Sequence, residues 1–184
     1  MAQNIENMDA VALLKADHRK VEEIFAAFEK ARSDDRKREL ALQACLELKV
    51  HATIEEEIFY PACRGRVEED LLDESYVEHD GAKLLINDIE ASGPEDDFYD
   101  AKVKVLSEMI EHHVKEEEQY VEGLFAQARD AGLDMDALAA RMRERKATAM
   151  EEYQAGKPAE PRTLNGGPSE SARVQLGKGG ELEA

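Results

Sequence analysis

Apolar residues recur at intervals of three and four along four segments of the chain, which is the spacing of one face of an α-helix. We expect the four helices near residues 9–32, 35–63, 68–91 and 95–130. The inward positions are Val11, Leu14, Val21, Phe25 and Phe28, then Ala41, Ala44, Leu48, Ile58 and Ala62, then Leu72, Tyr76 and Ile86, and then Tyr99, Val103, Leu106, Ile110 and Leu124. The pattern predicts four amphipathic helices whose apolar faces share one core.

The connections between these helices are short, so consecutive helices should be antiparallel neighbours in an all-α, up-and-down four-helix bundle. A fifth helix is expected from Asp134, with Met135, Leu138 and Met142 on one face. This helix would pack on the outside of the bundle or form a dimer interface. We divide the chain into a bundle with its fifth helix, 1–153, and a flexible Gly- and Pro-rich tail, 154–184.

Polar residues that bind metals fall on the same apolar faces. Each of the four helices carries one histidine there, and two helices also carry a glutamate four residues later: His18, His51 with Glu55, His79, and His113 with Glu117. Side chains four residues apart are neighbours on a helix, so each His-x-x-x-Glu pair can bind one metal from one side. Two buried carboxylates at one level would repel each other unless a cation lay between them.

The two halves of the chain repeat this arrangement, since the spacing from His18 to His51 nearly equals that from His79 to His113. We therefore expect two helical hairpins related by a pseudo-twofold axis. A single core histidine is most often a satisfied hydrogen-bonding residue, but two in-phase copies favour a metal site. Imidazole and carboxylate ligands without thiolate suit a pair of iron ions better than a structural zinc ion.

With these motifs in place, the sequence resembles the hemerythrin-like, or HHE cation-binding, family. The resemblance covers roughly residues 9–130 and rests on Asp17-His18, His51-Ala-Thr-Ile-Glu55-Glu56-Glu57-Ile-Phe-Tyr-Pro61, Glu78-His79 and His113-Val-Lys-Glu-Glu117-Glu118. It implies a four-helix bundle with a non-haem di-iron site that handles dioxygen or its relatives. It also implies that His18, His51, His79 and His113 are terminal ligands and that Glu55 and Glu117 bridge the two irons.

The sequence departs from oxygen-carrying hemerythrins at one position. These proteins have a fifth histidine one turn after the third-helix histidine, where this chain has Lys83. A protonated lysine is a poor iron ligand, so one iron could have an open or water-filled position. Tyr76 is either a substitute ligand or a core residue. We also expect the change from Pro61 in the first repeat to Gly123 in the second to be structural only.

Other polar and aromatic residues near the motifs receive no ligand role. His112 follows His113 directly but points about 100° away, toward a flank of its helix. Tyr60 and Tyr120, like Tyr76, are expected in the core or at its rim. We assign no catalytic residue.

Charge and cysteine placement narrow the possible partners and the compartment. With a net charge of −18, the chain is not expected to bind nucleic acid or anionic membranes. Cys45 and Cys63 lie on one predicted helix about 27 Å apart, too far for a disulfide. Two free thiols, with no secretory signal in residues 1–9 and no apolar span, predict a cytoplasmic protein.

Several functions remain open at this stage. The first is a di-iron protein that binds or senses dioxygen or nitric oxide. The second is an enzyme that disproportionates hydrogen peroxide, and the third is an iron storage or sensing protein. A purely structural bundle is the fourth. The chain could be a monomer or a homodimer.

Overall fold

The computed structural model describes residues 7–164, and the regular elements in that range are all helical. They are α1 (Ala10–Lys30), α2 (Asp34–Ile54), a π-helical turn η2 (Glu55–Phe59), α3 (Tyr60–Cys63), α4 (Glu69–Ala91), α5 (Tyr99–Glu118), α6 (Leu124–Asp130) and α7 (Met135–Gln154). The expectation of an all-α fold is confirmed.

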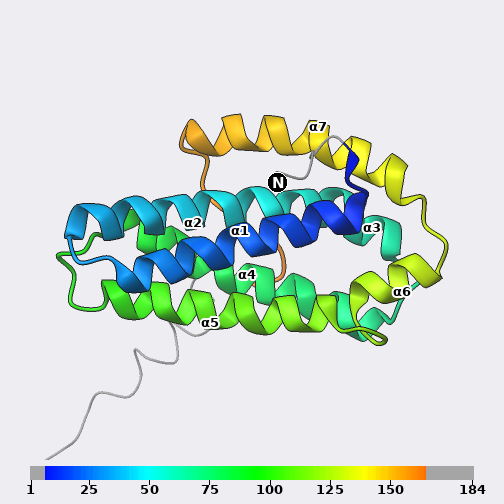
Figure 1. Ribbon diagram of the computed structural model, residues 1–184, viewed down its shortest axis with the longest axis horizontal. Helices are drawn as coiled ribbons and strands as arrows, with labels where there is room; N and C mark the ends of the chain where they lie inside the picture. Colours follow the sequence, from blue (N-terminus) through cyan, green and yellow to red (C-terminus); the bar gives the residue numbers. More distant parts are fainter. Residues whose placement is uncertain (1–6, 165–184) are drawn as a thin grey trace, which may run out of the picture.

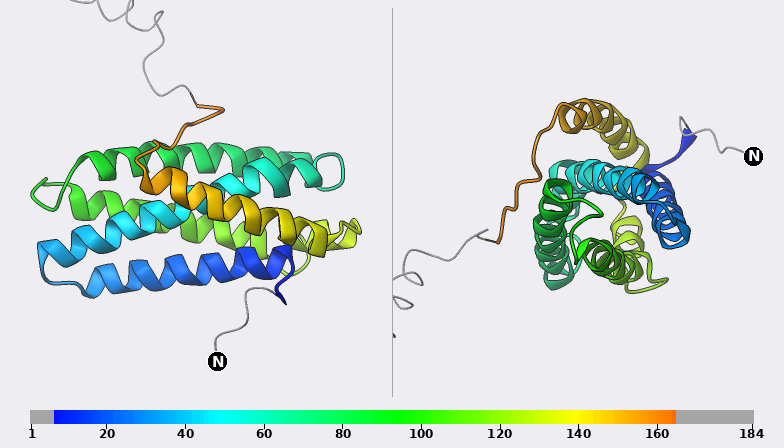
Figure 2. Two further views of the ribbon diagram at one scale, coloured as in Figure 1. Left: turned by 90° about the horizontal axis from the view of Figure 1, so that it is seen from above. Right: turned by 90° about the vertical axis from the view of Figure 1, so that its left-hand side faces the viewer.

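Four long rods form the bundle. The continuous unit α2–η2–α3 lies beside α1 and α4, and α5 lies beside α4 and α1, so that the chain runs up and down in turn (Figure 1). The end-on view shows these four rods around a common axis, with α7 outside them against α1 and α2 (Figure 2). The fifth helix therefore packs on the outside of the bundle, as one of the two sequence alternatives stated.

The predicted helix boundaries have identifiable physical causes. Asp9 caps α1 by accepting a hydrogen bond from the backbone N–H of Ala12 at 2.9 Å. Asp134 caps α7 in the same way through the N–H of Ala137 at 3.0 Å. Ser92 caps the C-terminus of α4, where its backbone N–H donates to the carbonyl of Ile89. These local signals place the helices, and their apolar faces then determine how they pack.

The apolar core consists of two clusters at different levels of the bundle. One cluster includes Leu14, Ile58 and Leu124, and the other includes Phe25 and Leu106. The predicted ligand histidines come from the level between them on each helix. The bundle thus has a polar layer that apolar side chains close off at both ends.

The prediction of one long fourth helix over 95–130 is wrong. The helix α5 begins at Tyr99 and ends at Glu118, and α6 starts only at Leu124. A Cβ atom at Gly123 would lie 2.6 Å from backbone atoms of Gln119, so this tight turn requires glycine. Tyr120, expected in the core or at its rim, lies in the turn and is 94% exposed.

The start of the predicted tail makes specific contacts. The side chain of Asn87 donates to the carbonyl of Ala159 at 2.7 Å and accepts from its N–H at 3.1 Å. The carboxylate of Asp80 accepts from the backbone N–H of Arg162 at 2.7 Å and of Leu164 at 3.0 Å. We call residues 155–164 the strap. The rest of the predicted tail, 165–184, lies outside the described residues.

Candidate metal centre

The structure brings all six predicted ligand residues together in the polar layer. His18, His51, Glu55 and Glu117 form one buried group of potential ligands, and Glu55, His79 and His113 form a second. Glu55 belongs to both groups. One pair of histidines thus comes from the hairpin α1–α2 and the other from the hairpin α4–α5, as the internal repeat predicts.

The distances between these atoms match the edges of a metal coordination shell. The Nε2 atoms of His18 and His51 lie 3.0 Å apart, and those of His79 and His113 lie 3.1 Å apart. Metal–ligand bonds of about 2.0–2.2 Å place ligand atoms roughly 2.8–3.6 Å from one another in octahedral or tetrahedral geometry. Each pair of imidazoles is therefore spaced to bind one ion.

The two glutamates connect the histidine pairs. Glu55 Oε2 lies 3.1 Å from His51 Nε2 and 3.4 Å from His79 Nε2. Glu117 Oε2 lies 3.3 Å from His18 Nε2 and 3.5 Å from His113 Nε2. Each carboxylate thus reaches one histidine of each hairpin, which is the position of a bridging ligand.

Two oxygens of these glutamates provide a test of whether the site fits a metal. Glu55 Oε1 and Glu117 Oε2 are buried and have no hydrogen-bond partner among residues 7–164. A buried carboxylate oxygen without a partner is costly, and a cation is the partner that removes this cost. The donor set and the unpaired oxygens therefore fit two bound cations.

Without a cation, the histidines and glutamates must balance their charges with protons. Burial alone would lower the pKa of His51, but the charges of Glu55 and Asp17 and the hydrogen bonds to them together outweigh it and raise that pKa to about 10. Burial disfavours the charged form of His79, whereas hydrogen bonds to Glu55 and Glu56 favour it. The pKa of His79 rises to about 9 as a result. The pKa of Glu55 is held well below its usual value, because these histidines outweigh its burial. The carboxylates of the polar layer thus stabilise positive charge on the groups beside them.

A second set of acidic residues lies behind the imidazole rings. The Nδ1 atoms of His18, His79 and His113 lie 2.8, 3.0 and 2.8 Å from carboxylate oxygens of Glu118, Glu56 and Glu78, respectively. For the fourth ring, His51 Nδ1 lies 3.7 Å from Asp17. A carboxylate that accepts the Nδ1–H fixes the tautomer and turns Nε2 toward the metal.

The sequence positions of these outer acids follow the pseudo-twofold repeat. Glu56 and Glu118 directly follow the two inner glutamates and contact the first histidine of the opposite hairpin. Asp17 and Glu78 directly precede those first histidines and face the second histidine of the same hairpin. The sequence analysis gave Glu56 and Glu118 no ligand role, and the repeat is the signal that marks them as a matched pair.

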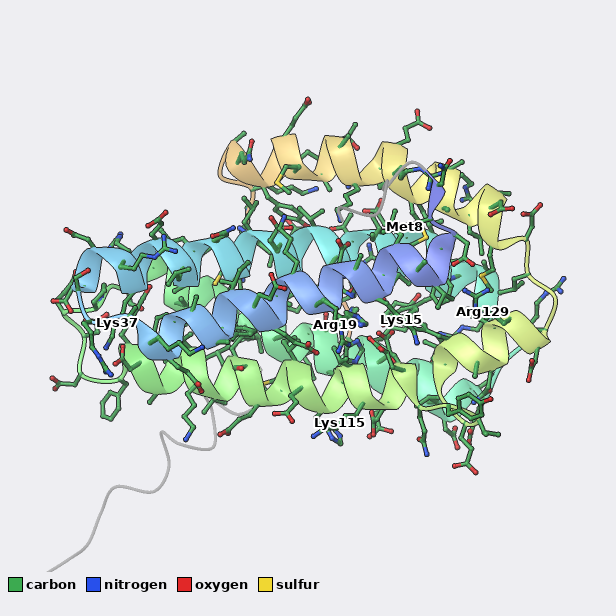
Figure 3. The ribbon with its side chains drawn as sticks, viewed as in Figure 1. Met8, Lys15, Arg19, Lys37, Lys115 and Arg129 are labelled. Carbon is green, nitrogen blue, oxygen red and sulfur yellow. The ribbon has the colours of Figure 1, made fainter. Side chains whose placement is uncertain are left out.

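Basic residues contact three of the four outer acids. Lys146 of α7 binds Asp17, and Arg162 of the strap lies 3.1 Å from Glu56. Lys15 and Arg19 project from α1 toward α5 (Figure 3), where they lie 3.6 and 2.6 Å from Glu118. The fourth outer acid, Glu78, has no Lys or Arg nitrogen within 4.0 Å among residues 7–164.

Comparison with known proteins agrees with this geometry. Residues 9–125 match the hemerythrin HHE cation binding domain family. The chain belongs to this family. The HHE domain thus includes the six buried residues and the bundle that holds them, and the resemblance inferred from the motifs is confirmed.

Two relatives show how far the likeness extends. A DNA nickase of Nostoc sp. (strain PCC 7120) is 28% identical over 113 residues, which are 61% of this chain and 32% of the nickase. The chain thus spans about a third of the length of that protein. A solved HHE domain protein, an Rv2633c homologue from Mycobacterium kansasii, superposes with a TM-score of 0.62 at 20% identity and covers 81% of this chain and 94% of its own. This likeness shows the fold.

Tyr60 is part of the centre, although the sequence reasoning placed it in the core or at its rim. Its fully buried hydroxyl donates to Glu117 Oε1 at 2.9 Å and lies 3.4 Å from Glu55 Oε2. The cause is η2, in which the N–H of Tyr60 bonds to the carbonyl of Glu55, five residues earlier. A π-turn places residues five apart on one face, so helical periodicity did not reveal this contact. Pro61 was the available signal, because proline disturbs the preceding α-helical turn.

Lys83, which the resemblance places at the position of a fifth histidine, pairs with two carboxylates. Its Nζ atom lies 2.6 Å from Glu56 Oε1 and 3.0 Å from Asp80 Oδ1. Tyr76, the other substitute considered, packs against Tyr60, with the two ring centroids 5.2 Å apart. Among the described residues, the HHE domain supplies no fifth nitrogen ligand at this point.

A small cavity of about 20 Å³ adjoins the four histidines. Its other walls are mostly apolar and include Val21, Ile86 and Val114, with Lys83 on one side. A cavity of roughly 10–15 Å³ is the minimum for one water molecule. The space beside the centre therefore admits a molecule of a few atoms and excludes larger ones.

No described helix is long and apolar enough to cross a membrane.

Proposed function

We propose that this HHE domain holds a pair of non-haem iron ions and uses them to bind or sense dioxygen or nitric oxide. In this proposal His18 and His51 are terminal ligands of one iron, and His79 and His113 are terminal ligands of the other. Glu55 and Glu117 would be shared by the two ions, because each lies near one histidine of both pairs. The ligands to be bound are diatomic, and the domain acts as a binding protein rather than as an enzyme.

One observation carries the proposal: two pairs of imidazole nitrogens are joined by two buried carboxylates, each with an oxygen that finds no hydrogen-bond partner in the described part of the chain. Nitrogen and oxygen donors suit iron, and bridging carboxylates inside a helical bundle are the usual setting of di-iron sites. Among the described residues no cysteine belongs to either ligand group, which disfavours a structural zinc site. The adjoining cavity has room for a diatomic ligand.

The protein's own groups prepare this site for a small ligand. Glu56, Glu78 and Glu118 hold the outer ring N–H groups, so the inner nitrogens point at the ions. Tyr60 donates a hydrogen bond to Glu117 and thereby orients that carboxylate. The apolar clusters on both sides exclude bulk water. Bound iron would supply the electrons and the open coordination position that dioxygen requires.

Iron analysis combined with optical spectroscopy tests the proposal. Apo-protein reconstituted with Fe(II) without air should retain two irons per chain after desalting. Admission of air or nitric oxide should then change the visible spectrum, and His113→Ala should retain less iron. A protein that retains no iron, or a fully loaded protein whose spectrum does not respond to either gas, would contradict the proposal.

Peroxide disproportionation is the second candidate, and the environment of Lys83 favours it. Lys83 lines the inner cavity and also a pocket of about 130 Å³ between the bundle and the strap, which is partly open and polar. A small polar substrate could approach along this side. Oxygen release from peroxide by the loaded protein, well above that of free iron and absent in His113→Ala, would establish this activity. A rate equal to that of free iron would exclude it.

A further inference from the structure

Glu78 differs from the other three acids behind the histidines because no lysine or arginine nitrogen of residues 7–164 lies within 4.0 Å of it. Its pseudo-twofold counterpart, Asp17, is bound by Lys146 of α7. Glu78 faces His112 instead, with Oε1 at 3.6 Å from His112 Nε2, while its Oε2 contacts His113 Nδ1 at 2.8 Å. Lys146 thus contacts the outer acid of one half of the repeat, and the imidazole of His112 contacts that of the other half.

A third side chain completes a cluster at this point. Glu116 Oε1 lies 3.3 Å from His112 Nε2, and the ligand atoms of Glu78, His112 and Glu116 all lie within 4.8 Å of one another. The two measured distances to the imidazole match the roughly 3.3–3.6 Å edge of a tetrahedral shell with metal–ligand bonds of about 2.0–2.2 Å. A distance of 3.6 Å is too long for a hydrogen bond, so a direct bond does not account for this spacing.

The local charge is unbalanced. Two carboxylates face a single imidazole, and neither carboxylate has a Lys or Arg nitrogen within 4.0 Å in the described part of the chain. Lys115, the neighbouring lysine, extends from the outer side of α5 (Figure 3) and pairs with Glu111 at 2.8 Å. The cluster is accessible, because the His112 side chain is 63% exposed.

We propose that Glu78, His112 and Glu116 form a third metal site, separate from the buried pair, which binds one divalent transition-metal cation at the surface. One imidazole and two carboxylates suit Zn²⁺, Co²⁺ or Fe²⁺, and solvent supplies the remaining ligands. His112, which the sequence analysis left without a ligand role, is the nitrogen ligand of this site. Glu78 connects the surface site to the buried centre, because Glu78 Oε2 contacts His113 Nδ1.

Zinc binding to the iron-loaded protein tests this site. Calorimetric titration with Zn²⁺ should show one further ion per chain, with iron analysis before and after to establish that no iron is displaced. His112→Ala and Glu116→Gln should each weaken this binding more than about tenfold, since even indirect supports of a metal change affinity by about that much. Glu111→Gln removes an exposed carboxylate of the same helix outside the cluster and should bind zinc as the wild type does.

Zinc binding at the surface site can be tested whether or not the buried centre retains iron. If the protein retains no iron, the same titration on the apo-protein still compares wild type with His112→Ala, and the difference between them measures the surface site alone. No zinc binding that depends on His112, or equal loss in Glu111→Gln and Glu116→Gln, would overturn the proposal.

Discussion

Each histidine of the centre lies between an inner carboxylate and an outer one, and this double contact makes its orientation specific. His18, for example, directs Nε2 at Glu117 and Nδ1 at Glu118, which are adjacent in sequence. The histidines and inner glutamates could be predicted from the sequence because they share the phase of apolar residues. The repeat marks Glu56 and Glu118 as a matched pair, but the histidine that each of them contacts depends on which helices become neighbours.

Tyr60 is the residue whose role the sequence concealed, and its hydroxyl can be tested directly. Tyr60→Phe removes the donor to Glu117 and should lower the affinity for iron by roughly 10–100-fold, as expected for a group that orients a ligand. Competition of the loaded protein with a chelator measures this change. Tyr76→Phe is the matched control, because it removes the hydroxyl of a neighbouring ring that packs on Tyr60. Equal iron retention by both variants would contradict the assigned role.

The two cysteines should be inert in the native protein. Burial, followed by the charge of Glu90, raises the pKa of the Cys45 thiol to about 12, and burial likewise raises that of Cys63 to about 12. Because only thiolate reacts, iodoacetamide at pH 8 should label neither residue until the protein is unfolded. Mass spectrometry measures the labelling. Rapid modification of native protein at pH 8 would show that these side chains are accessible.

At the scale of elements, propensity and capping predicted where most helices begin and end, and tertiary contacts decided the rest. The split between α5 and α6 arises from a close backbone approach at Gly123, which apolar spacing does not report. The π-turn η2 also breaks the period of 3.6 on which the sequence reading relied. The π-turn begins at the glutamate of one His-x-x-x-Glu pair and the split follows the glutamate of the other, where the two halves of the repeat diverge.

The strap depends on Asp80, which accepts hydrogen bonds from several of its groups. Asp80→Asn removes the charge that attracts these donors, so the amides of residues 162–164 should exchange hydrogen much faster than in the wild type. Hydrogen exchange with mass spectrometry measures this. Asp88→Asn, an exposed residue of the same helix paired with Lys102, is the control and should leave these amides unchanged. Slow exchange in Asp80→Asn would mean that other contacts hold the strap.

At the scale of the molecule, the bundle encloses a charged layer between two apolar clusters, and cations should therefore stabilise the fold as a whole. A ligand at a thousandfold excess over its dissociation constant stabilises the native state by about 4 kcal/mol. For a chain of this size, that corresponds to a change of roughly 8–16 °C in Tm.

Calorimetry of metal-loaded and chelated protein should show this difference in Tm. His18→Ala removes one terminal ligand and should reduce the difference. Identical melting of loaded and chelated wild-type protein would mean that metal does not contribute to the native state, and the buried carboxylates would then need another partner.

The most direct test of the account is anomalous diffraction at the iron absorption edge from crystals of the reconstituted protein. We predict two peaks in the polar layer, one beside His18 and His51 and the other beside His79 and His113, with Glu55 and Glu117 between them. A map without peaks there, or with a single peak bound by one histidine pair, would contradict the claim that this bundle is built around two metal ions.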